Sequence, residues 1–167
     1  MSNLTGKIIK GIGGFYYVKT CDGIVECRAR GNFRKKDILP YVGDDVAISA
    51  EDDGTGYVLE IKERKNSLIR PPLANLDVIF VVLSAKNPTA DLLTADKLIA
   101  IAEHNGIEPI IVISKGDLDT DNAEKIRKTY EKCGFAVFES AMCDENIVKC
   151  DRIYDFIKEN LSDKISA

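Results

Sequence analysis

The sequence predicts a small all-β barrel followed by an α/β domain with a parallel sheet, because composition and hydrophobic pattern both change near residue 66. Nine of the 12 glycines precede residue 67. Residues 1–66 carry 11 basic and 10 acidic residues, a net charge of +1, whereas residues 67–167 carry 12 and 17, a net charge of −5. We therefore expect one domain over residues 1–66, a linker over 67–73 and a second domain over 74–167.

Five short strands are expected in the first domain. They cover residues 7–12, 15–20, 24–29, 45–50 and 56–63. Turn-forming pairs, including Gly13-Gly14, Asp22-Gly23 and Asp53-Gly54, separate them. This strand count favours an oligonucleotide-binding (OB) fold, with an SH3-like barrel as the alternative.

A cluster of cations in the first domain indicates contact with RNA. Its members are Arg28, Arg30, Phe33, Arg34, Lys35 and Lys36. Basic side chains neutralise phosphates, and an aromatic ring among them can stack on an unpaired base. Phe15 and Tyr17 alternate on one strand and add stacking surface. The alternative is a solvated loop, with the aromatic rings filling the barrel core.

Two continuous apolar runs in the second domain are typical of strands covered on both faces. They cover residues 77–83 and 107–113, and a third strand is expected over 135–139. Because helices are expected after each strand, the order predicts a parallel sheet with right-handed crossovers. Ligands of such sheets collect beyond the carboxyl ends of the strands.

Three helices are expected between and after these strands. The first covers residues 91–103 and is closed by Asn105-Gly106. The second begins at the cap Asp121-Asn122-Ala123-Glu124 and ends at Gly134. The last is an amphipathic helix predicted by the apolar residues Ile147, Cys150, Ile153, Tyr154, Ile157 and Leu161.

Several classes of function are disfavoured by what the sequence contains. The five cysteines form no C-x-x-C pair and His104 is the single histidine, so a disulfide framework, a zinc site or a Ser-His-Asp triad is not expected. The apolar runs are too short to span a bilayer, and the N-terminus lacks the pattern of a secretory signal. We expect a soluble, cytoplasmic protein with no membrane partner.

Polar segments follow two of the expected strands. Ser114-Lys115-Gly116-Asp117 resembles the N-K-x-D motif of GTPases, and Ser140-Ala141 resembles the S-A motif found one strand later. The resemblance implies that the Asp117 carboxylate accepts hydrogen bonds from guanine N1–H and the N2 amine, whereas adenine has no amine there. The stem of Lys115 would lie over the base, and the Ala141 N–H would meet O6. Ser114 stands where asparagine is usual, so the contact made by that amide is lost.

The order of segments points to a particular class of GTPases. No G-x-x-x-x-G-K-[ST] phosphate loop occurs in the 167 residues, and a β-barrel precedes the guanine motif. This order is that of circularly permuted GTPases, and the chain resembles the N-terminal part of the ribosome small-subunit-dependent GTPase A family (RsgA/YjeQ type). Besides the guanine motifs, the segments that carry the resemblance are residues 11–18, Arg30-Gly31, 42–46, 64–71 and 74–77.

The family resemblance implies an OB domain that binds 16S-type rRNA, a GTPase domain and a later zinc-binding domain. It implies GTP hydrolysis stimulated by the small ribosomal subunit during its late maturation, with GTP/GDP, Mg²⁺ and Zn²⁺ bound by the full-length family. In the family, the phosphate loop would begin just after a strand like residues 164–167. We therefore expect this chain to be the N-terminal portion of such a GTPase, to bind GTP/GDP, Mg²⁺ and Zn²⁺ weakly or not at all, and to be inactive alone.

Two other functions stay open at this point. One is a naturally short, non-catalytic adaptor that binds the ribosome, and the other is a general binder of single-stranded RNA.

Overall fold

The computed structural model describes residues 2–29, 33, 39–51, 54–143, 147–150 and 152–167, with the backbone alone at residues 2, 142, 143 and 147–150. It divides into two compact units, Met1–Asn75 and Leu76–Ala167. The described helices are all too short or too polar to cross a lipid bilayer.

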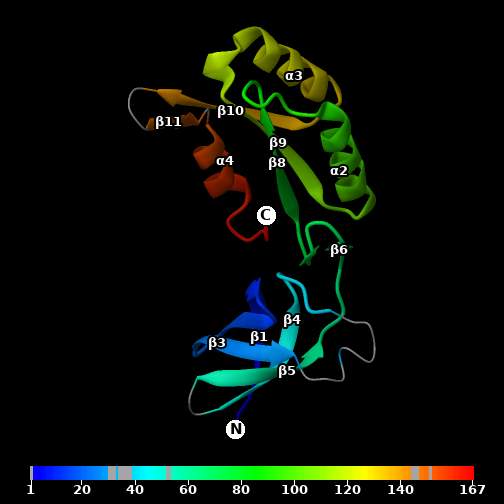
Figure 1. Ribbon diagram of the computed structural model, residues 1–167, viewed down its shortest axis with the longest axis vertical. Coiled ribbons are helices and arrows are strands. Elements are labelled where there is room, and N and C mark those ends of the chain that lie inside the picture. Colours follow the sequence, from blue (N-terminus) through cyan, green and yellow to red (C-terminus); the bar gives the residue numbers. More distant parts are fainter. Residues whose placement is uncertain (1, 30–32, 34–38, 52–53, 144–146, 151) are drawn as a thin grey trace. The chain divides into compact units, whose positions relative to one another are not determined.

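The first unit contains a closed five-stranded barrel (Figure 1). Its strands are β1 (Ser2–Ile12), β2 (Phe15–Thr20), β3 (Gly23–Ala29), β4 (Asp45–Ala50) and β5 (Thr55–Ile61). They are joined in the order β1-β2-β3-β5-β4, with β3 and β5 parallel and the other pairs antiparallel. The five expected strands and the OB-like barrel are confirmed.

Strand β1 is longer than expected because its first half has a partner of its own. Ser2 to Lys7 pair with Ala50 to Asp45 of β4, whereas the later residues pair with β2. Alternate residues of the strands point inward and form the barrel core, which consists of Ile8, Val18, Cys27, Val46, Ile48 and Val58.

The segment after β5 is bonded to the barrel. It contains the short strands β6 (Ser67–Leu68) and β7 (Leu73–Ala74), which pair with each other. The amide N–H of Ala74 donates to Val42 O at 2.9 Å, and Asn75 Nδ2 donates to Gly43 O at 3.0 Å. Gly43 has φ 97°, and a Cβ there would collide with the Ala74 carbonyl, so only glycine fits.

A buried ion pair fixes the same segment. Arg64 donates through Nε to Asp44 Oδ1 at 2.7 Å and through Nη2 to Asp44 Oδ2 at 2.8 Å. Arg64 Nη2 also donates to Leu39 O at 2.7 Å, and its guanidinium lies 4.3 Å from the centre of the Tyr41 ring. The Asp44 side chain has no exposed surface, and the hydrogen bond to it is the main cause that raises the pKa of Arg64.

The second unit is a sheet with helices on both faces. Its elements are β8 (Val78–Ser84), α2 (Leu92–His104), β9 (Glu108–Ser114), the 3₁₀ turn η1 (Gly116–Leu118), α3 (Thr120–Lys132), β10 (Ala136–Cys143), β11 (Ile147–Cys150) and α4 (Ile153–Asn160). The strand order is β11-β10-β9-β8, and β8, β9 and β10 are parallel. Figure 1 shows α2 and α3 on one side of this sheet and α4 on the other.

Two expectations for this unit were wrong. Ile147 and Cys150 do not belong to the last helix, because residues 147–150 form β11, which pairs antiparallel with the extended end of β10. The sheet is therefore not wholly parallel, and α4 starts only at Ile153. The cap of α3 is Asp119 rather than Asp121, since the Asp119 carboxylate accepts from the Asn122 N–H at 3.1 Å.

The last residues of the chain run alongside β8. Asp77 N donates to Ile165 O at 2.8 Å, and Phe80 N donates to Ala167 O at 2.8 Å. Val78 and Ser166 form a parallel bridge. This segment therefore adds a short parallel stretch at the edge of the sheet that β9 does not occupy.

Candidate guanine site and RNA-binding face

Three serines lie in one row across the parallel strands. Ser84, Ser114 and Ser140 are paired in register, at or near the carboxyl ends of β8, β9 and β10. Ala85 N donates to Ser114 O at 2.9 Å, which ties the segment after β8 to the end of β9. The two guanine motifs therefore meet at one edge of the sheet, where parallel sheets bind ligands.

The Ser114-Lys115-Gly116-Asp117 segment forms a tight turn into η1. Lys115 has φ 56°, and its ammonium donates to the carbonyl of Asn87 in the segment after β8. Asp117 is exposed in the first turn of η1, where the helix end favours a negative charge. Among the described residues, no hydrogen bond or ion pair engages its carboxylate, which is therefore available to a ligand.

Gly116 lies directly against Glu139. A Cβ at residue 116 would collide with the Glu139 carboxylate, so the turn needs glycine while that carboxylate stays in place. Arg127 of α3 holds Glu139, with Nη2 donating to Oε2 at 2.8 Å. This hydrogen bond is the main cause that raises the pKa of Arg127. Helix α3, β10 and the motif turn are thus connected through one side chain.

Side chains at the start of α3 also bond to the sheet edge that carries the motif. Asn122 Nδ2 donates to the Ala85 carbonyl at 2.7 Å, and Lys86 lies 3.6 Å from the Asp119 cap carboxylate. Both contacts join α3 to the segment after β8. The loops around the motif are therefore supported by side-chain bonds from two neighbouring elements.

The residues at this edge suit a guanine base. A free carboxylate accepts two N–H donors at once, and guanine presents two on adjacent atoms. Within the residues that the structure describes, no His, Cys, Asp or Glu side chains gather in a group of three that could hold a metal ion.

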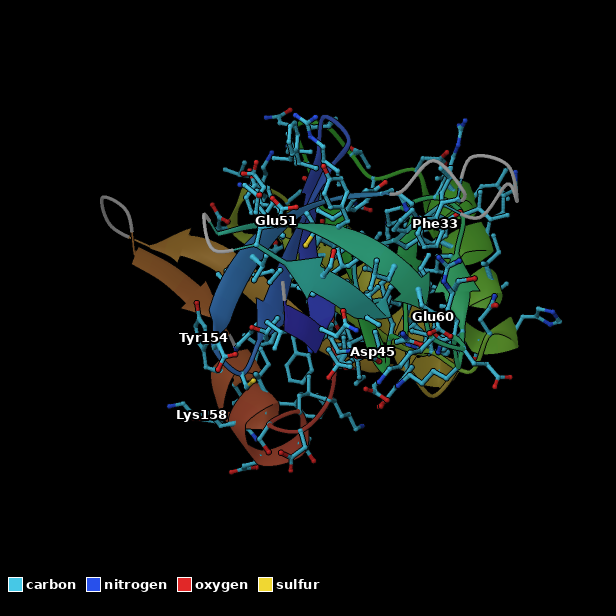
Figure 2. All side chains as sticks on the ribbon, turned by 90° about the horizontal axis from the view of Figure 1, so that it is seen from below. Phe33, Asp45, Glu51, Glu60, Tyr154 and Lys158 are labelled. Atoms are coloured by element: carbon cyan, nitrogen blue, oxygen red, sulfur yellow. The ribbon has the colours of Figure 1, made fainter. Side chains whose placement is uncertain are left out.

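Two of the six residues expected to contact RNA lie in the part of the barrel that the structure describes. Arg28 is exposed on β3, and its guanidinium lies 4.6 Å from the centre of the Phe15 ring. Phe33 (Figure 2) is half-buried and packs against the barrel core. Four further predicted contact residues, Arg30, Arg34, Lys35 and Lys36, lie outside the described residues.

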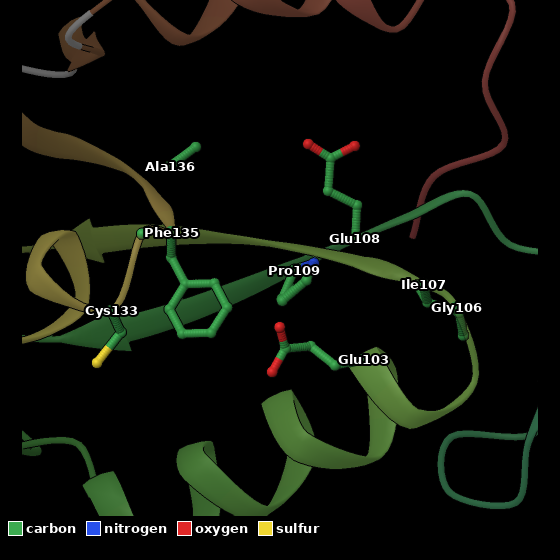
Figure 3. Close-up of a pocket in the computed structure, with 9 residues that line it drawn as sticks. Glu103, Gly106, Ile107, Glu108, Pro109, Cys133, Phe135 and Ala136 are labelled. Carbon is green, nitrogen blue, oxygen red and sulfur yellow. The ribbon is translucent and has the colours of Figure 1, made fainter.

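A pocket of 430 Å³ lies at the opposite edge of the second unit's sheet (Figure 3). Its lining includes Glu103 at the end of α2, Glu108 at the start of β9, and Cys133 and Phe135 after α3. Glu108 accepts from Lys164 at 2.9 Å. The pocket is at the amino end of the strands, so it is separate from the guanine motifs.

Sequence reasoning missed Glu139, Arg127 and Asn87 as neighbours of the motif. Glu139 directly precedes Ser140-Ala141, and that position was the available signal. Arg127 and Asn87 carried no local signal, because their contacts with the motif exist only once α3 and the segment after β8 are folded against it.

Comparisons with known proteins match both units of the chain to one family. The family described as "RsgA N-terminal domain" matches residues 5–58, and the family described as "RsgA GTPase" matches residues 61–166. The small ribosomal subunit biogenesis GTPase RsgA of Caldanaerobacter subterraneus is 42% identical over 168 residues, which is 99% of this chain and 55% of that protein. RsgA of Halalkalibacterium halodurans is 47% identical over 144 residues, 84% of this chain and 49% of that protein.

A solved structure shares the fold. The crystal structure of YloQ, described as a circularly permuted GTPase, matches with a TM-score of 0.69 and 39% identity over 99% of this chain and 58% of that one. The chain spans about half the length of the curated relatives that it matches. Because the two family matches together reach from residue 5 to residue 166, the chain belongs to the RsgA family.

Proposed function

We propose that this chain supplies the rRNA-binding barrel and the guanine-recognition half of a GTPase that acts in late maturation of the small ribosomal subunit in the cytoplasm. The observation that carries the proposal is the exposed Asp117 carboxylate, which follows Ser114 at the point where β9 pairs with Ser140 of β10. The matches to proteins named as small ribosomal subunit biogenesis GTPases support it.

In this proposal the site recognises the guanine base and does not catalyse phosphoryl transfer. Asp117 accepts from guanine N1–H and the N2 amine, the stem of Lys115 covers the ring, and the backbone of Ala141 donates to O6. Ser140 orients that backbone, and Ser114 holds the turn. Phosphoryl transfer needs a phosphate cradle, a lysine and Mg²⁺, and no phosphate-loop pattern occurs in these 167 residues. We therefore expect no GTP hydrolysis by this chain alone, with or without small ribosomal subunits.

Base recognition is tested by NMR titration of the ¹⁵N-labelled chain with GMP and AMP. Two hydrogen bonds to a charged group predict weak binding, with a Kd on the order of 1 mM. We expect GMP to shift the amide signals of residues 114–117 and 140–141, and AMP to leave them in place. AMP shifts equal to those of GMP, or GMP that leaves the signals of residues 114–117 and 140–141 unshifted, contradict the proposal.

Two variants sharpen this test. Asp117→Asn replaces one acceptor by a donor, so it should lose the GMP shifts and respond to XMP, whose C2 carbonyl accepts a hydrogen bond. Asp121→Asn makes the same change on the exposed start of α3 and should behave as the unmodified chain. If the chain binds rRNA but shows no response to guanine, the non-catalytic adaptor becomes the better account.

A further inference from the structure

Two rows of side chains cross the outer face of the barrel. Phe15, Arg28 and Tyr57 are paired in register across β2, β3 and β5. Tyr17, Glu26 and Thr55 form the next row on the same strands. The inward-pointing neighbours Cys27 and Val58 are fully buried, so these rows face outward.

The rows enclose a pocket of 180 Å³. It is lined by Phe15, Glu26, Arg28, Thr55, Gly56 and Tyr57. That volume is smaller than the pockets of drug-sized ligands, so it suits a single planar ring system.

The groups around the pocket are arranged for three different contacts. Tyr57 is 39% exposed, and its aromatic ring lies among the residues that line the pocket. Arg28 is held over Phe15 and keeps its planar donor edge for a phosphate. Glu26 lies beside Tyr17 in its row, and the neighbouring carboxylate raises the pKa of Tyr17. A carboxylate has about four lone-pair sites, so Glu26 keeps acceptor capacity for a ligand.

We propose that this pocket binds one unpaired guanine of an RNA strand, with Tyr57 stacked on the base, Glu26 accepting from its N1–H and N2 amine, and Arg28 at the adjacent phosphate. The inference rests on the RNA binding proposed above for the barrel, and it adds a base preference. Guanine fits because its edge presents two adjacent donors. Uracil presents one N–H between two carbonyls, and those carbonyls would face the Glu26 carboxylate.

Fluorescence anisotropy with labelled RNA hexamers tests the base preference. The full chain is titrated, in low salt, with all-uridine RNA and with the same RNA carrying one guanosine at the third position. We expect at least about fivefold tighter binding of the guanosine RNA. Glu26→Gln should remove that preference, whereas Glu60→Gln, the same charge change at another exposed position of β5 (Figure 2), should keep it.

Stacking is tested in the same assay. Tyr57→Ala should weaken binding of the guanosine RNA at least about fivefold, and Tyr57→Phe should bind as the unmodified chain does. Circular dichroism confirms that each variant retains its strands. Asp117→Asn should keep the guanosine preference, because the Asp117 site and the barrel pocket are different sites.

The outcomes separate this inference from the proposed function. If both RNAs bind equally, or if Glu26→Gln keeps the preference, the guanine pocket is overturned while RNA binding by the barrel stands. If neither RNA nor rRNA binds at low salt, the RNA-binding part of the proposed function fails as well.

Discussion

Replacing Arg64 by methionine removes the partner of a carboxylate that has no exposed surface. Asp44 loses two charge-assisted hydrogen bonds, at 2.7 and 2.8 Å, and keeps the Tyr41 N–H at 2.7 Å. The carbonyl of Leu39 loses a donor as well. The buried charge is then left with one neutral donor, and this is the reason to expect a large loss of stability.

The magnitude follows from the burial of the pair. Breaking a buried ion pair from one side costs about 3–5 kcal/mol. The Arg64 side chain is 23% exposed, so water can partly replace it, and we expect the lower end, about 3 kcal/mol. For a urea dependence of about 1.5 kcal/mol/M, the unfolding midpoint of the barrel falls by about 2 M.

Urea unfolding followed by far-UV circular dichroism measures the effect. The matched control is Lys7→Met, which breaks the Lys7–Asp45 pair of 2.9 Å in the same barrel. Those side chains are 31% and 47% exposed, so the control should lose less than about 1 kcal/mol. Adding Asp44→Leu to Arg64→Met removes the unpaired charge and should recover part of the loss. Equal midpoints for the Arg64 and Lys7 variants would refute the reasoning.

Three further outcomes are expected. Gly116→Ala should displace Glu139 from Arg127 and lower the free energy of unfolding by about 1 kcal/mol, measured by thermal unfolding. In a chain that already carries Glu139→Ala, adding Gly116→Ala should cost nothing more. Losses that simply add in the double variant would contradict the contact. Burial raises the pKa of Cys27 to about 11, so the unfolded chain ionises this thiol at a lower pH than the folded chain does. The free energy of unfolding should therefore fall by about 2–3 kcal/mol as the pH rises from 9 to 11. A Cys27→Ala variant should show a flatter pH profile, and an equally steep profile would contradict this cause. Tyr130→Phe removes the hydroxyl that donates to Asp96 at 2.8 Å, and urea unfolding should show a loss of about 0.5–1.5 kcal/mol in the free energy of unfolding. An unchanged midpoint would show that this hydrogen bond does not stabilise the fold.

The fold was predictable where local pattern and tertiary environment agree. Helix α2 is closed by Asn105, and Gly106 follows with φ 69°, as predicted, whereas Asp91 caps the helix instead of starting it. Residues 147–150 were misassigned because apolar spacing in four residues does not distinguish a strand from a helix. Their state depends on pairing with the end of β10, which is a long-range contact.

The candidate site was predictable in its motif and not in its surroundings. The end of the apolar run 107–113 located Ser114, and the end of the strand expected over 135–139 located Ser140. The two serines lie together, as a parallel sheet requires. The contacts of Lys115 with Asn87 and of Gly116 with Glu139 depend on how separate loops fold against each other. On the barrel, the sequence drew attention to Arg28, but Tyr57 joins it only through the parallel pairing of β3 and β5.

The contact between Gly116 and Glu139 also constrains how this motif can change during evolution. A side chain can enter position 116 without strain only after position 139 has become smaller or its carboxylate has left Arg127. The reverse order passes through a less stable intermediate. The two positions should therefore vary together among relatives, with a residue larger than glycine at 116 accompanying a shorter or uncharged residue at 139.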